Sequence, residues 1–116
     1  MNVEVAVIQF LKSQTNWTVA GEVPADNPDK FITVERTGGA REAMVLDMAE
    51  VMISVYHKTS KLECANQTDE IADVIPGLLE DYADITRAKV NSVIQADDTI
   101  KGYRRYLIYA DVYLRR

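Results

Sequence analysis

The sequence predicts a single α+β domain over residues 1–116, in which a mixed or antiparallel sheet of four to five strands packs against two helices and carries a projecting hairpin. Two segments show apolar residues at helical spacing, and several others alternate apolar and polar residues as strands do. The composition, 47% hydrophobic and 27% charged, is that of an ordinary soluble domain. A chain of 116 residues is too short for two full domains and long enough to bury a core without disulfides or metal ions.

The first predicted element is an amphipathic helix at residues 3 to about 14. Apolar residues from Val3 to Leu11 recur at intervals of three and four, which gives this helix one apolar stripe. Two prolines and an Asp-Asn pair then mark residues 21–29 as a loop, because each of these residue types favours turns. The helix must therefore pack on elements that follow the loop.

Residues 31–36 alternate apolar and polar side chains and are predicted to form a strand. This strand is expected to end at Gly38 and Gly39, in a tight turn. A returning strand over about 42–48 completes a hairpin. The polar residues around the two glycines require no burial, which predicts that the hairpin projects beyond the sheet.

Residues 43–57 carry two periods at once. Methionine recurs at every fourth residue, as on a helix, whereas the β-branched residues between Val51 and Val55 recur at every second residue, as on a strand. The β-branched residues favour a strand over 50–57, and we adopt this interpretation. A continuous helix over residues 40–50, which the methionine spacing allows, is the alternative.

A second helix is expected to begin after Ser60. The segment Ser60–Glu63 fits a capping box, in which the serine and glutamate side chains each accept a free backbone N–H of the first turn. The apolar stripe continues to Ile75. Pro76 and Gly77 are then predicted to kink or end the helix, because proline lacks a backbone donor and clashes with the preceding turn. One or two further turns are expected beyond the kink.

Two strands are predicted to complete the sheet. The first covers residues 89–94, a turn follows at 97–102, and the final strand begins at Tyr103. Alternate side chains of the final strand point to opposite faces. The core-facing set is Tyr106, Ile108, Ala110, Val112 and Leu114, and the other set is Arg105, Leu107, Tyr109, Asp111 and Tyr113.

Charge and composition exclude several functional classes. Eighteen acidic residues against thirteen basic ones give a net charge of −5, which is the wrong sign for gripping a phosphate backbone. The single cysteine, Cys64, excludes an internal disulfide. The first residues lack the basic and apolar regions of a signal peptide, and no apolar run is long enough to cross a bilayer. We therefore expect a cytosolic protein with no membrane association.

Residue types that could carry chemistry fit structural roles better. His57 has no serine partner in a nucleophile elbow, and Cys64 is typical of a buried inert thiol. Residues 26–37 lack the glycine and glutamate that a calcium loop requires. The acidic group Glu80, Asp81 and Asp84 is typical of a solvated helix end. No catalytic, cofactor-binding or metal-binding residue is predicted, so an enzyme or a small ligand-binding domain is the least favoured class.

The outward set of the final strand is the most informative surface. Tyr109 and Tyr113 lie between Arg105 and Arg115, and tyrosine and arginine are enriched at protein interfaces because each joins contact area to a polar group. Two interpretations stay open at this point. The surface either contacts another protein or is covered by one of the chain's own helices, since a small sheet needs a helix layer on one face.

Several stretches together resemble the tail-terminator, or tail-completion, proteins of long-tailed bacteriophages and prophages. The order of predicted elements matches that family across nearly the whole chain, although Pro76 with Gly77 departs from its smooth helix. The stretches that carry the resemblance are Phe31–Gly39, Asp47 ahead of Val51–Tyr56, the helix that follows, and Tyr103–Tyr106.

The resemblance implies a non-enzymatic structural protein that forms a ring, typically of six copies, at the head-proximal end of the tail tube. Such a ring stops tube polymerisation and presents a surface to the head connector. The implied partners are further copies of the chain, the tail tube protein and the head connector protein, with a monomer expected in dilute solution. DNA would pass through the lumen without specific binding, and the implied location is the host cytoplasm during assembly and then the head–tail junction of the virion.

A head-to-tail ring needs two different patches on each subunit. We expect Arg36 and Arg41, which flank Gly38 and Gly39 on the hairpin, to contact an acidic helix surface of the next copy. A second candidate interface consists of Arg105, Tyr109 and Tyr113. Another head–tail connector protein or a minor tail protein is the alternative function.

Overall fold

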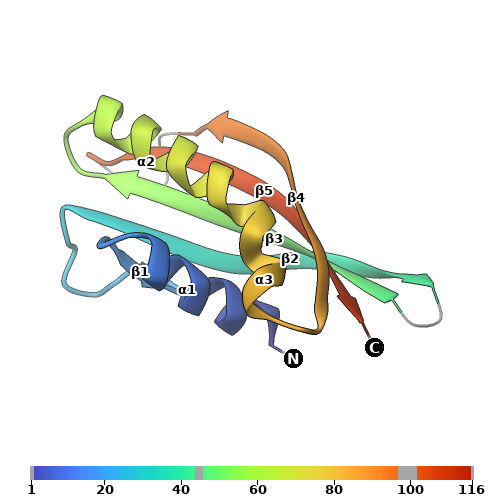
Figure 1. The fold of residues 1–116 in the computed structure, drawn as a ribbon. Helices are drawn as coiled ribbons and strands as arrows, with labels where there is room; N and C mark the ends of the chain where they lie inside the picture. Colours follow the sequence, from blue (N-terminus) through green and yellow to red (C-terminus); the bar gives the residue numbers. More distant parts are fainter. Residues whose placement is uncertain (1, 44–45, 97–101, 116) are drawn as a thin grey trace.

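The computed structural model describes residues 2–43, 46–96 and 102–115 and has the predicted α+β architecture. Five strands form one sheet in the order β1-β2-β3-β5-β4, and the helical elements lie together on one face (Figure 1). β1 runs parallel to β2, and the other neighbouring strands are antiparallel. The elements are α1 (Val3–Gln14), β1 (Thr18–Ala20), β2 (Lys30–Ala43), β3 (Leu46–His57), α2 (Lys61–Val74), the 3₁₀ turn η1 (Ile75–Gly77), α3 (Leu78–Asp81), β4 (Ile85–Gln95) and β5 (Arg104–Arg115).

Helix α1 has the predicted bounds and the predicted buried stripe. Asn2 caps it, because its side-chain Oδ1 accepts the backbone N–H of Val5 at 3.1 Å. Val7 and Leu11 are fully buried against the sheet. Glu4 stands in the first turn, where a negative charge is favourable at a helix N-terminus.

Helix α2 begins as predicted but only half of the capping box forms. Ser60 Oγ accepts the backbone N–H of Glu63 at 3.1 Å, as in a capping box. The Glu63 carboxylate does not return to Ser60; it lies 2.6 Å from His57 Nε2, and the Ser60 N–H donates to His57 Nδ1 instead. The predicted kink is confirmed, because Pro76 lies in η1 between α2 and α3.

The predicted turn at Gly38 and Gly39 is wrong. Both glycines lie inside the long strand β2, paired with Glu50 and Ala49 of β3. The strand predicted over 42–48 is divided, because residues 42–43 end β2 whereas residues 46–48 begin β3, and β3 continues through the strand predicted over 50–57. The helical alternative over 40–50 is wrong as well, since the described residues of this range lie in strands. Residues 44–45, which include Met44, lie outside the described residues, as do residues 97–101 of the turn predicted over 97–102.

Close backbone approach explains a glycine inside β2. A Cβ atom on Gly39 would lie 2.6 Å from the Met48 carbonyl oxygen and 2.8 Å from a guanidinium nitrogen of Arg36, whereas one on Gly38 would meet nothing within 4 Å. Gly39 is therefore required by the tight pairing of β2 with β3 and not by a turn. A β-bulge between Arg36 and Gly38 adds local twist at the same place.

The short strand β1 was not predicted from the sequence. Its three residues pair with Phe31–Thr33 at the outer edge of β2. Three residues are too few to show a period of two, so no pattern marks this strand. Strand β4 is also longer than predicted, beginning at Ile85 where the sequence indicates residue 89.

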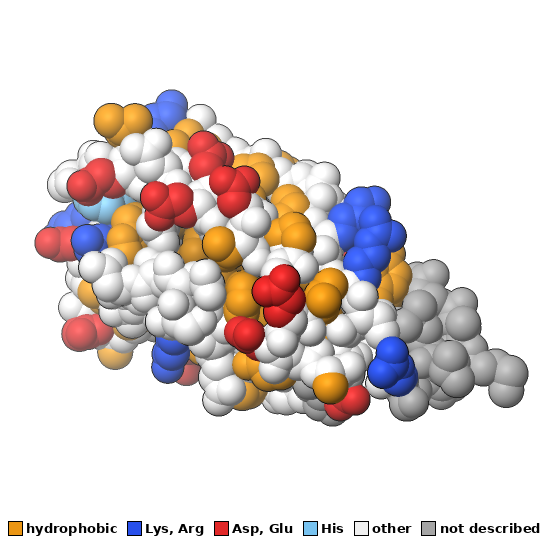
Figure 2. Space-filling view, in the orientation of Figure 1, with side chains coloured by type: hydrophobic (Ala, Val, Ile, Leu, Met, Phe, Trp, Pro, Cys, Tyr) orange, Lys and Arg blue, Asp and Glu red, His pale blue; other side chains and the backbone are white. Residues whose placement is uncertain are grey.

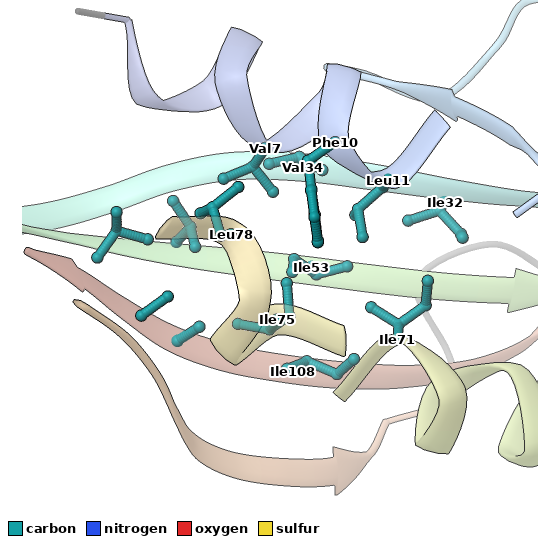
Figure 3. Close-up of a cluster of buried hydrophobic side chains, with 14 of the residues drawn as sticks. Val7, Phe10, Leu11, Ile32, Val34, Ile53, Ile71, Ile75, Leu78 and Ile108 are labelled. Atoms are coloured by element: carbon teal, nitrogen blue, oxygen red, sulfur yellow. The ribbon is translucent and has the colours of Figure 1, made fainter. Parts of the chain in front are cut away.

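The main hydrophobic core lies between the helices and one face of the sheet. Figure 3 shows side chains of α1, η1 and α3 directed at the inner face of β2, β3 and β5. The predicted core set of β5 is on this face, with Ile108, Ala110 and Val112 fully buried. A second, smaller cluster of Phe31, Tyr56 and Tyr103 lies apart from it.

The β2–β3 hairpin extends the molecule along its long axis. The principal extents are 46 × 25 × 24 Å, and Figure 1 shows the hairpin reaching beyond the helix layer. No helix within the described residues is both long and apolar enough to cross a membrane.

Candidate functional site

The predicted interface residues fall on two opposite faces of the sheet. Arg105, Tyr109 and Tyr113 lie on the face away from the helices, which we call the open face. Arg36 lies on the helix side of β2, since it pairs with the buried Val51. The structure therefore does not bring the predicted set together into one site.

The sequence left open whether the outward residues of β5 contact another protein or are covered by one of the chain's own helices. The helices pack on the opposite face, so no helix of the described chain covers Tyr109 or Tyr113, and both are half-buried. Leu107 on the same face is 8% exposed. This surface is an amphipathic sheet face that the chain's own helices leave free.

Strand register arranges the open face in rows that cross the sheet. One row holds Met52, Tyr109 and Ser92, and another holds Met48, Tyr113 and Arg87. The Arg87 guanidinium lies 6.0 Å from the centre of the Tyr113 ring, within the range of a cation–π contact.

A charged row lies between these two aromatic rows. It consists of Glu50, Asp111 and Lys89. Glu50 and Asp111 are directly opposite each other, and two like charges in such a pair are unfavourable. The Thr37 hydroxyl, which donates to Glu50 Oε1 at 2.8 Å, and Lys89, which pairs with Asp111, reduce this repulsion. The open face therefore combines apolar contact area with charges of both signs, the composition of a protein interface.

Arg105 is held at the end of the open face near the smaller aromatic cluster. Its guanidinium lies 5.5 Å from the centre of the Tyr56 ring, and Nη2 donates to Ser54 Oγ at 3.3 Å. Tyr103 adds to this cluster and donates from its hydroxyl to the Pro28 carbonyl at 2.8 Å. These contacts tie the loop after β1 to the sheet.

The hairpin arginines occupy a different environment. Arg36 Nε donates to the Gly38 carbonyl at 3.2 Å, and its backbone N–H donates to Glu4 Oε2 at 3.0 Å. Arg36 lines a shallow hollow with Asn2, Val3 and Glu4. Arg41 pairs through its backbone with Asp47, and its side chain lies outside the described residues.

The helix side of the molecule carries an acidic surface. Figure 2 shows carboxylates gathered over α2 and α3, with Lys and Arg toward the margins of this view. Gln14, Asp73 and Val74 line both of two shallow hollows between α1 and the α2–α3 segment. The exposed carboxylates, which we call the acidic helix layer, belong to Glu63, Asp69, Glu70, Asp73, Glu80 and Asp81.

The residues with catalytic potential have structural roles. His57 is 7% exposed, and its Nδ1 accepts the backbone N–H groups of Thr59 and Ser60 at 3.2 and 2.9 Å. Cys64 is buried, and its thiol lies 3.1 Å from the Val55 carbonyl oxygen. Within the described ranges, no group of three or more His, Cys, Asp and Glu residues is placed to hold a metal ion.

Sequence reasoning missed three residues that contribute to these surfaces. Met48 and Met52 belong to the open face because they lie opposite Tyr113 and Tyr109, a relation that depends on strand register. Glu4 reaches the edge of β2, 32 residues away in the chain. The methionines share the period-two alternation of β3, so a correct strand assignment would have revealed them, whereas no signal points to Glu4.

Comparisons with known proteins show a shared fold and no matching family model. No protein-family model matches the chain, and a search of the curated proteins finds no match. Among solved structures, the chain is similar to one from the virion of a native gene transfer agent (GTA) particle. The likeness has a TM-score of 0.75, covers 98% of this chain and 95% of that chain, and has 14% sequence identity. The two chains share a fold.

Proposed function

We propose that this chain is a structural, non-enzymatic subunit of a phage-like virion. The observation that carries the proposal is the fold shared with a chain of the gene transfer agent virion over nearly the full length of both chains. Two further features are consistent with it. The open face has the mixed composition of a protein contact, and the buried side chains of His57 and Cys64 hold the fold together.

Within this class we propose the tail terminator. The subunit closes a ring of six copies on the head-proximal end of the tail tube, stops tube polymerisation and offers the outer side of the ring to the head connector. The resemblance of Phe31–Gly39 and Tyr103–Tyr106 to tail terminators supports this choice. Assembly takes place in the host cytoplasm, and the ring then occupies the head–tail junction of the virion.

The charge distribution supports a head-to-tail ring with a DNA passage. Arg36 on β2 and the acidic helix layer carry opposite charges at different places on the subunit, as a head-to-tail contact requires, and Arg41 follows in the same strand. The net charge of −5 keeps passing phosphates from adhering to the wall of the lumen. Contacts between exposed charges are weakened by salt, so ring closure is expected to be salt-sensitive and to need the tube end as a template.

Addition of the purified protein to growing tail tubes, assembled from the tube protein of the same phage, tests the proposal. We expect tube elongation to stop and electron micrographs to show a ring on one end of each tube. The double variant Arg36→Glu and Arg41→Glu should cap less well while its melting temperature stays unchanged. Elongation that continues unaltered with the wild-type protein would falsify the terminator role. Binding to the isolated head connector without binding to tubes would favour the alternative, another head–tail joining protein.

A further inference from the structure

Within the described parts of the chain, each outer strand of the sheet has a stretch without a neighbouring strand. β4 is the last strand on one side, and no described strand pairs with its outer edge. On the other side β1 pairs with only Phe31–Thr33 of β2, so β2 continues past it to Ala43 with its outer edge open to other strands. We call Glu35–Ala40 the β2 free edge and Asn91–Gln95 the β4 free edge.

The β4 free edge lacks the features that usually protect an edge strand. It has no charged residue and no proline, and it exposes Val93 and Ile94 by 44% and 46%. The Ala96 N–H donates to the Arg105 carbonyl of β5. In an antiparallel pair, the backbone N–H and C=O groups of successive residues point alternately toward the partner strand and away from it. The backbone groups of Ile94 therefore face β5, and those of Val93 face outward.

The β2 free edge is blocked by a side chain. Glu4 Oε2 accepts the outward backbone N–H of Arg36 at 3.0 Å. A methyl group on Gly21, the residue after β1, would lie 3.8 Å from Glu4 Oε1. The Glu4 carboxylate thus stands where β1 would continue and satisfies a donor that an added strand would otherwise use.

The two free edges run in opposite directions and are offset from each other along the sheet. Glu35 and Ser92 lie on one row across the sheet, through Met52 and Tyr109. Arg36 lies on the row of Val51 and Val93 on the row of Ile53, so their outward groups are two residues apart along the strands. A second copy in the same orientation, displaced by two residues along the strands, would therefore bring Arg36 of its β2 beside Val93 of β4 as an antiparallel neighbour. A stagger of this kind between neighbouring strands is what closing a sheet into a ring requires.

We propose that copies of this chain join by strand addition, the β4 free edge of one copy pairing with the β2 free edge of the next as Glu4 releases the Arg36 N–H. The inference rests on the proposed ring and names the contact that closes it. Two different edges meet at each junction, the head-to-tail arrangement that generates rings. Charge favours a second copy as the occupant, because Arg36 lies on the helix side of β2 and would stand near α3, which packs on β4 and carries Glu80 and Asp81.

Substitutions at Val93 test the junction in the tube-capping assay. Val93→Pro removes an outward donor without touching the bonds to β5, and Val93→Lys places a charge on the edge while keeping the backbone donor. Both should raise the protein concentration needed to cap half of the tubes at least tenfold. Val93→Thr, which keeps a β-branched strand residue and its N–H, should cap as the wild type does.

These outcomes separate the junction from the function. Val93→Pro and Val93→Lys proteins that fold, as judged by circular dichroism, and still close rings at wild-type concentration would overturn the strand-addition contact while the terminator role stands. A wild-type protein that never caps tubes would overturn the terminator role itself.

Glu4 supplies an independent arm of the test. Glu4→Ala frees the β2 edge, so we expect this variant to self-associate without tubes at a protein concentration at least threefold below that of the wild type, measured by light scattering. Glu22→Ala removes an equal charge from an exposed residue nearby and is the matched control, with no expected change. Equal association of the Glu4→Ala and Glu22→Ala variants would contradict the blocking role of Glu4.

Discussion

The two faces of the sheet are built from the same strands but differ in what they do. On the helix side, Ile53 and Ile108 are fully buried beneath α1, α2 and η1. On the open face, the neighbouring residues Met52 and Tyr109 stay half-buried and stand beside a charged row. Adjacent residues of one strand therefore belong either to the core or to the open face. We expect substitutions on the helix side to change stability and those on the open face to change assembly.

The largest loss of stability is expected from the helix side. Ile53→Ala deletes buried methyl groups and leaves a cavity in the core, so we expect a loss of about 3 kcal/mol in the free energy of unfolding. Met52→Ala, one residue away on the open face, should cost less than about 1 kcal/mol, since the site is already half in contact with water. Urea denaturation of both variants measures the difference. Equal losses would show that the open face is buried as deeply as the core.

Gly38 and Gly39 are also neighbours in one strand with different surroundings, and smaller effects on stability are expected there. Gly39→Ala places a methyl group against the Met48 carbonyl and should cost roughly 1–3 kcal/mol, as overpacked sites do. Gly38→Ala meets free space and should stabilise by about 0.5 kcal/mol, because alanine restricts the unfolded chain. Thermal unfolding of the two variants checks the signs. A destabilised Gly38→Ala protein would mean that Gly38 has the special backbone role.

His57 connects the sheet to the start of α2, and its substitution should cause the next largest loss of stability. Its Nδ1 accepts two partly buried backbone N–H groups before α2, so His57→Leu leaves these donors without their partner and should cost about 1–2 kcal/mol. His57→Asn places an acceptor close to the position of Nδ1 and should recover part of that loss. Denaturation midpoints of the two variants provide the measurement. A His57→Leu protein as stable as the wild type would show that water satisfies these donors.

The helix side of the fold was largely predictable from the sequence because its signals are local. The bounds of α1 follow from apolar spacing, and the kink before α3 follows from Pro76. The hairpin was misread because a glycine pair usually marks a turn, whereas Gly39 is required by contact with a strand that lies farther along the chain. Close approach between strands leaves no mark in the local pattern.

The open face was only partly predictable for the same reason. The alternation of β5 identified Tyr109 and Tyr113 correctly as the set that points away from the core. Their neighbours Met48 and Met52 depend on the register between strands, and the Glu4 contact with Arg36 depends on how α1 packs. These contacts join residues from distant segments of the chain, and a single sequence without its fold does not show which residues meet.

The smallest effect on stability, and a large one on assembly, is expected at Tyr109 and Tyr113. Replacing both by serine removes half-buried aromatic surface from the open face without opening the core, so the cost in stability should stay near 1 kcal/mol. If this face contacts the tube or the connector, the loss of two aromatic anchors at its centre should abolish capping, because such residues carry most of the energy of an interface. A matched control is Tyr82→Phe, which removes only a hydroxyl bonded to the Ala6 carbonyl on the helix side and should lower stability slightly while leaving capping intact. Capping by the double serine variant at wild-type concentration would show that the open face is not the contact surface, and the division of labour between the two faces would have to be abandoned.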